Sequence, residues 1–125
     1  MAQLFFAQYG AQFVGGGLFE SHLPWQPAVD IYRCAEGWLL KFELAGVCEE
    51  DIHIEADSRG ITVSGIRRDF RRVDQQETYL MEIAYSRFER FVVLPEPIEG
   101  VQLNADVRDG MLYVQVLTMS KQEPR

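Results

Sequence analysis

The chain has 125 residues, of which 47% are hydrophobic and 25% are charged, and its formal net charge is -7. A chain of this length builds one hydrophobic core, and this mixture is that of an ordinary globular protein, so several domains and intrinsic disorder are both excluded. The negative charge repels nucleic acids and acidic membranes, which we do not expect as partners. We find no export signal and no run of about 20 apolar residues that would span a membrane. The cysteines Cys34 and Cys48 are therefore expected to be free thiols, and the location to be cytoplasmic.

Residues 1–24 are expected to form an N-terminal arm that is separate from the folded domain. Aromatic residues first recur at helical spacing, and the run Gly15-Gly16-Gly17 then breaks the pattern. A phosphate-binding loop needs a lysine and a serine or threonine after its last glycine, where this chain has Leu18 and Phe19, so we reject nucleotide binding. The apolar residues of the arm are Leu4, Phe5, Phe6, Tyr9, Phe13, Val14, Leu18 and Phe19.

From Trp25 onward, apolar and polar residues alternate in short runs, which is typical of antiparallel strands with one buried face. The turn sequence Asp109-Gly110 joins the last two runs as a hairpin. Strands are expected near residues 29–32, 38–44, 52–55, 61–64, 79–85, 88–94, 103–107 and 112–117. Seven or eight short strands without βαβ spacing predict an all-β fold, an immunoglobulin-like antiparallel β-sandwich.

One stretch, Arg68–Thr78, is too long for a tight hairpin and too polar to be buried. Its only apolar residues are Phe70 and Val73. Long excursions of this kind usually serve an interaction. The stretch also carries most of a basic cluster, which we interpret as a solvated loop compensated by nearby acids. The cluster comprises Arg67, Arg68, Arg71 and Arg72, and the acids are Asp69, Asp74 and Glu77.

The residues that carry chemistry do not form a reaction centre in the sequence. His22, His53 and the two cysteines lack the compact spacing of a metal site. The acids at 49–51 lie at a loop-to-strand junction, where carboxylates are usually solvated, and the sequence signals no apolar pocket around them. We find no set of nucleophile, base and oxyanion donor. We therefore expect no enzyme activity, no metal and no cofactor.

Residues 25–117 resemble the α-crystallin domain of small heat-shock proteins, and residues 118–125 then form a short C-terminal tail. The matching segments are W-x-P-x-x-D-I-Y at 25–32, L-P-G-V followed by D-I at 44–52, S-G-x-R at 64–67, F-x-R-x-F with L-P at 88–95, and A-x-x-x-n-G-x-L at 105–112. The loop between the third and fourth segments resembles that of the bacterial and plant branch of the family. Ala45 replaces the usual proline, and Ser86 stands where the family often has glycine. The tail lacks the Ile/Val-x-Ile/Val motif, so we do not expect large cages built through that motif.

The resemblance implies an ATP-independent holdase, a chaperone that covers the apolar surface of unfolding proteins before they aggregate. Its expected contacts with these clients are the arm residues named above and a groove between two strands. The groove lies between the strand with Ile52 and Ile54 and the strand with Leu103 and Ala105. The alternative is a β-sandwich adaptor similar to p23-like co-chaperones, which would be monomeric, whereas the heat-shock family forms dimers.

The resemblance also implies a homodimer made by strand exchange, and larger homo-oligomers built through the arm. We expect a crossing strand near Phe70–Gln75 to pair with the edge at Val29–Tyr32 of the partner chain. The expected dimer contacts are Val29, Ile31, Tyr32, Phe70, Val73 and Arg90.

Overall fold

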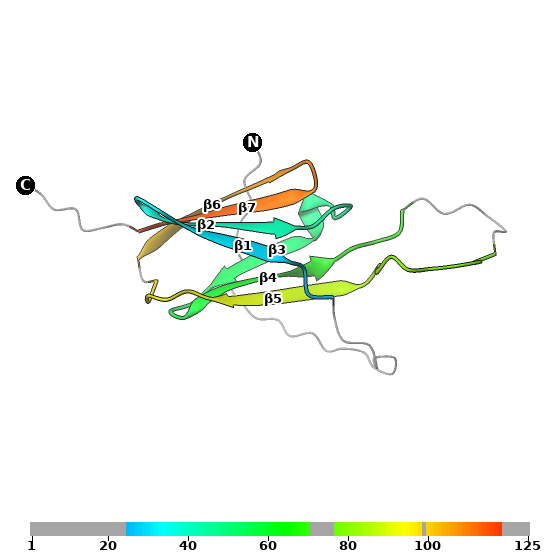
Figure 1. The fold of residues 1–125 in the computed structure, drawn as a ribbon, viewed down its shortest axis with the longest axis horizontal. Helices are drawn as coiled ribbons and strands as arrows, with labels where there is room; N and C mark the ends of the chain where they lie inside the picture. The colour runs from blue at the N-terminus through cyan, green and yellow to red at the C-terminus, as the bar shows by residue number, and fades with distance from the viewer. Residues whose placement is uncertain (1–24, 71–76, 99, 119–125) are drawn as a thin grey trace, which may run out of the picture.

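The computed structural model describes residues 25–70, 77–98 and 100–118, and it contains seven strands there (Figure 1). A single turn of 3-10 helix, η2 (Glu49–Asp51), lies between the second and third strands. The strands are β1 (Val29–Cys34), β2 (Gly37–Glu43), β3 (Ile52–Ala56), β4 (Gly60–Ile66), β5 (Arg87–Val93), β6 (Val101–Arg108) and β7 (Met111–Thr118).

The strands form two antiparallel sheets that lie face to face (Figure 1). The four-stranded sheet has the order β1-β2-β7-β6, and the three-stranded sheet has the order β3-β4-β5. This arrangement confirms the predicted immunoglobulin-like β-sandwich.

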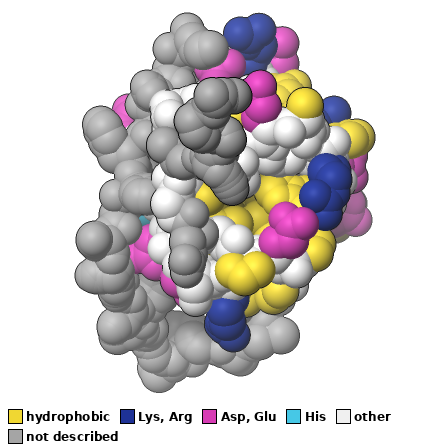
Figure 2. Space-filling view, turned by 90° about the vertical axis from the view of Figure 1, so that its left-hand side faces the viewer, with side chains coloured by type: hydrophobic (Ala, Val, Ile, Leu, Met, Phe, Trp, Pro, Cys, Tyr) yellow, Lys and Arg dark blue, Asp and Glu magenta, His cyan; other side chains and the backbone are white. Residues whose placement is uncertain are grey.

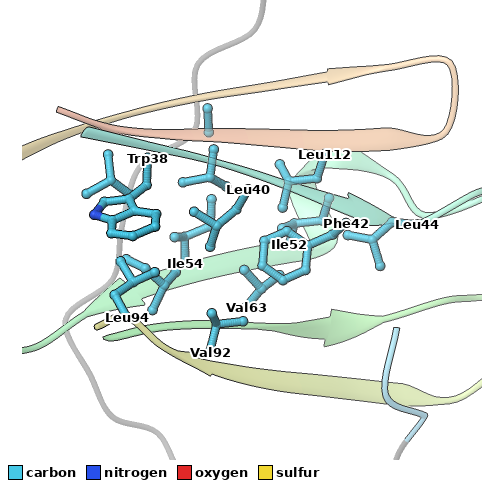
Figure 3. Close-up of a cluster of buried hydrophobic side chains, with 14 of the residues drawn as sticks. Trp38, Leu40, Phe42, Leu44, Ile52, Ile54, Val63, Val92, Leu94 and Leu112 are labelled. Carbon is cyan, nitrogen blue, oxygen red and sulfur yellow. The ribbon is translucent and has the colours of Figure 1, made fainter. Parts of the chain in front are cut away.

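Alternate side chains of β2, β3, β4 and β7 are buried in the space between the sheets (Figure 3). On β2, for example, Leu40 and Phe42 are fully buried and lie opposite Val114 and Leu112 of β7. Each fully buried side chain of this size contributes about 1.5–3 kcal/mol to stability. None of the polar or charged side chains in the described ranges is buried. The period-two alternation of the sequence therefore predicted the core correctly.

The tight turns follow their local sequence. Asp109 and Gly110 both have positive φ, 55° and 80°, which is the geometry of the two-residue hairpin that Asp-Gly predicts. Asp57 closes the β3–β4 turn, because its carboxylate accepts hydrogen bonds from the backbone N–H groups of Arg59 and Gly60 at 2.8 and 3.1 Å. These two donors stabilise the charged form and hold the pKa of Asp57 below its usual value.

Residues 25–28 form a strap that ties the two sheets together along one side. The Trp25 N–H donates to the Arg87 carbonyl of β5, and the Trp25 carbonyl accepts from the Glu89 N–H, both at 3.1 Å. Three residues later, the Ala28 carbonyl accepts from the Glu43 N–H of β2 at 3.1 Å. The strap leads directly into β1, so the β1 and β5 edges lie on the same side of the sandwich. The β3 and β6 edges consequently lie on the other side.

The predicted strand at Tyr79–Tyr85 was wrong, because the structure has no strand there. The physical reason is that the two strands that flank this stretch, β4 and β5, already have neighbours. Strand β4 pairs directly with β5, from Gly60 opposite Val93 to Ile66 opposite Arg87. The strap occupies the other edge of β5 at Phe88. The alternation in 79–85 thus has no neighbouring strand within the described part of the chain.

Candidate functional site

Among the described residues, the largest group of exposed apolar side chains lies in the segment between β4 and β5. Figure 1 shows the described part of this segment projecting beyond the end of the two sheets. Tyr79 is 97% exposed. The other exposed apolar residues of this group are Leu80, Met81, Ile83 and Tyr85. Soluble monomers rarely leave such a group uncovered, so we treat residues 79–83, the apolar segment, as a candidate interaction site.

The apolar segment has the alternation of a strand that has one apolar face. In an extended chain, alternate residues lie on the same side, which would place Tyr79, Met81 and Ile83 together. Glu82 would lie on the opposite side. The same alternation is visible in the sequence, where it predicted a strand within the chain's own sheet.

A second candidate site is the outer edge of β1. This strand is last in its sheet and pairs only with β2 among the described strands, so its outer backbone groups lack a ladder partner there. Ile31 and Tyr32 are 41% and 45% exposed, while Val29 is half-buried and packs against the core. The Lys41 ammonium lies 5.1 Å from the Tyr32 ring centroid and shields one face of that ring.

The remaining expected dimer contacts have different surroundings. Arg90 is half-buried, and its guanidinium donates a 2.8 Å hydrogen bond to the Pro27 carbonyl of its own chain. This bond holds the strap against β5. Phe70 is exposed, whereas Val73 lies outside the described residues.

The expected groove lies along the side that carries the β3 and β6 edges. Ile52, Ile54 and Ala105 are buried there, because their side chains point between the sheets and the facing sheet covers them. The expectation of exposed apolar surface on these three residues therefore needs correction. Leu103 remains partly exposed.

Strand β6 carries two further apolar residues that sequence analysis missed. Val101 and Val107 are partly buried and lie in the same alternation as Leu103. We call Val101, Leu103 and Val107 the β6 row. The sequence contains the pattern that identifies this row, because positions 101, 103 and 107 differ by multiples of two and so lie on one face of a strand. Because β6 is an edge strand, it has a neighbouring strand, β7, on one side only. Side chains on its inner face are therefore open to solvent on the other side, and the row is not fully buried.

All the apolar residues named in the arm lie outside the described residues, as do Arg71 and Arg72 of the basic cluster. Arg68 forms an ion pair of 3.0 Å with Asp51 of η2. This hydrogen-bonded acid raises the pKa of Arg68. The cluster is therefore compensated in part by an acid that lies outside the loop.

The opposite end of the sandwich is closed by charged and aromatic side chains. The Arg33 guanidinium lies 4.3 Å from the Trp38 ring centroid and pairs with Glu96 at 3.2 Å. Figure 2 views this end and shows hydrophobic side chains gathered at its centre, with basic and acidic side chains beside them. The nearby Cys34 thiol is free and exposed, and Cys48 is also free.

The described part of the chain contains no group of three or more His, Cys, Asp and Glu residues placed to hold a metal ion. Within those same ranges, no helix has the length and apolarity needed to cross a lipid bilayer. What the described surface offers is exposed apolar side chains and an open strand edge.

These features define the class of protein: a small β-sandwich with an open β1 edge and a projecting apolar segment. The sequence profile of the Hsp20/alpha crystallin family matches residues 30–125. The chain belongs to this family, which is that of the small heat-shock chaperones.

Relatives and solved structures agree with this assignment. Spore protein SP21 of Stigmatella aurantiaca is 28% identical over 99 residues, which are 79% of this chain and 59% of that protein. A probable 15 kDa heat shock protein of Leptospira interrogans is 29% identical over 98 residues, 78% of this chain and 72% of that protein. Heat shock protein 16.0 from Schizosaccharomyces pombe has the same fold, with a TM-score of 0.68, 24% identity and coverage of 83% of this chain and 94% of that one. This chain spans about three fifths of SP21, 59%.

Proposed function

We propose that this protein is an ATP-independent, non-enzymatic holdase that binds unfolding proteins and suppresses their aggregation. The observation that carries the proposal is the family match over residues 30–125. The β6 row, which is only partly buried, supports it, because a holdase needs apolar surface that an unfolding client can reach. No feature of the fold favours the p23-like adaptor.

The proposed client contacts are the arm and the β6 row. Ile52, Ile54 and Ala105 belong to the buried core against which that row packs. We retain the organisation into an arm (1–24), a domain (25–117) and a tail (118–125). The free thiols Cys34 and Cys48 support a reducing compartment, and we propose the cytoplasm.

The holdase proposal predicts suppression of aggregation without nucleotide. A client that unfolds on heating should scatter progressively less light as the protein is added, with near-complete suppression at about equal molar amounts. ATP should leave the curve unchanged, because the mechanism is coverage of apolar surface and not a driven cycle. A β-sandwich protein from outside the family, at the same concentration, is the control. An unchanged aggregation rate at every ratio would reject the proposal.

We further propose that two chains form a dimer by exchanging the apolar segment. The crossing strand was expected near Phe70–Gln75, of which the structure describes only Phe70. The exposed apolar side chains concentrate at residues 79–83, so we place the crossing strand there. It would add to the open β1 edge of the partner by β-augmentation.

Assembly beyond the dimer is expected to depend on the arm. Replacing Phe5, Phe6 and Phe13 with serine removes large apolar side chains from the arm and leaves the domain sequence unchanged. Each buried aromatic ring would contribute several kcal/mol to an interface, about 3 to 5 by the cost of truncation in cores. The triple variant should therefore run as a dimer in multi-angle light scattering wherever the unmodified chain runs larger. The same large mass in both proteins would contradict this role.

A further inference from the structure

Arg67, the first residue after β4, joins several parts of the chain at the base of the projecting segment. Its side-chain Nε–H donates to the Ala84 carbonyl at 3.0 Å, and Nη1 donates to the Ala45 carbonyl at 2.9 Å. Its backbone N–H donates to the Ser86 carbonyl at 2.9 Å. The guanidinium carbon lies 3.9 Å from the centroid of the Trp25 ring. One residue thus contacts the returning end of the segment, the loop after β2, and the strap.

These contacts close the projecting segment at its base. The chain leaves the sheet at residue 67 and returns at residues 84–86, so the two ends are fixed to each other. The contacts with Ala45 and Trp25 also fix this junction to the body of the sandwich. A loop with anchored ends can point in fewer directions, and less conformational freedom is then lost when it docks.

The chemistry of the site requires arginine. The planar guanidinium donates in two directions within its plane while its face stacks on an aromatic ring. A lysine ammonium at this position would stay charged but would not combine a stacked face with two in-plane donors. Arg59 flanks β4 at its other end and offers a comparison, because its guanidinium also lies over a ring, 5.0 Å from the Phe91 centroid.

We propose that Arg67 is a positioning residue that aims the apolar segment toward the partner chain and thereby sets the strength of the dimer. The proposal rests on the dimer proposed above. Through Trp25, Arg67 also connects the base of the segment to the residue that directly follows the arm. A substitution of Arg67 therefore removes contacts at the base of the apolar segment and at Trp25, where the arm joins the domain.

The test compares Arg67→Met, Arg67→Lys and Arg59→Met in the full chain. Sedimentation equilibrium gives the dimer dissociation constant, and hydrogen–deuterium exchange reports on peptides that cover residues 66–70 and 84–88. Arg67→Met should weaken the dimer about tenfold and speed exchange in both peptides, because the anchor is lost. Arg67→Lys should fall between this variant and the unmodified chain. Arg59→Met also loses a stacked arginine and should change neither reading.

Equal dissociation constants for Arg67→Met and Arg59→Met would overturn the proposal. If the unmodified chain is a monomer at every concentration, the dimer proposal fails. Hydrogen–deuterium exchange then tests only whether Arg67 anchors the base of the projecting segment. Faster exchange in the two peptides of Arg67→Met would then support the anchor, and unchanged exchange would reject it. If Arg67→Met does not fold, the dissociation constant and exchange of Arg67→Lys are compared with those of Arg59→Met instead.

Discussion

Replacing Gly65 with alanine is expected to destabilise the domain by about 3 kcal/mol, a large share of the roughly 5–15 kcal/mol that stabilises a domain. Gly65 lies in β4, and a Cβ added there would overlap the backbone carbonyl of Asp51 and approach the Phe88 ring edge at 2.7 Å. The carbonyl belongs to the chain just before β3, so it cannot move without disturbing the start of that strand. The loss should appear as a lower denaturation midpoint in urea.

Gly100→Ala is the matched control for this substitution. Gly65 and Gly100 both have positive φ, 158° and 62°. A Cβ added at Gly100, however, meets no atom within 4 Å. Its cost is therefore limited to the conformational strain, about 1 kcal/mol. The comparison separates the close approach of two chain segments from the backbone conformation. Similar losses of stability in the two variants would show that the contact with Asp51 is not what requires glycine at position 65.

Replacing Met81 and Ile83 together with serine is expected to weaken the proposed dimer about a hundredfold. Burying each apolar side chain at an interface contributes about 1.5 kcal/mol or more, and every 1.4 kcal/mol changes a dissociation constant about tenfold. Both side chains are exposed in the single chain, so the fold should not change. Sedimentation equilibrium measures the shift in mass, and circular dichroism verifies the fold.

Val93→Ser provides the control for this pair of substitutions. Val93 on β5 is 62% exposed, close to the 58% of Ile83, and it is likewise an apolar residue that contributes little to the core. Its substitution should leave the dimer unchanged. If the variant with serine at positions 81 and 83 dimerises as tightly as the Val93→Ser protein, the apolar segment does not form the dimer contact.

The sandwich and its core could be predicted from the sequence because strand periodicity is a local property. Alternation over Trp38–Leu44 indicates which side chains point inward, whatever lies opposite them. The Asp109-Gly110 turn was predictable for the same reason, since positive φ at two successive positions is a preference of those residues. The family resemblance also rested on such local segments, and the profile match over residues 30–125 confirmed it.

The interaction surfaces were less predictable, because exposure depends on what covers a residue. Alternation at Tyr79–Tyr85 indicated a strand, but only the direct pairing of β4 with β5 shows that this stretch has no place in the sheet. Ile52 and Ile54 were expected to be accessible, yet the facing sheet buries them.

The sequence by itself determined the fold class, the core positions, the tight turns and the family of this protein, because periodicity and turn preference act over a few residues. The tertiary structure decided which apolar residues stay exposed and which groups meet. The contacts of Arg67 with Ala84, Ala45 and Trp25 join residues that lie 17, 22 and 42 positions apart. Such contacts are set by how the two sheets pack and where the strap closes them, and no local pattern specifies that packing.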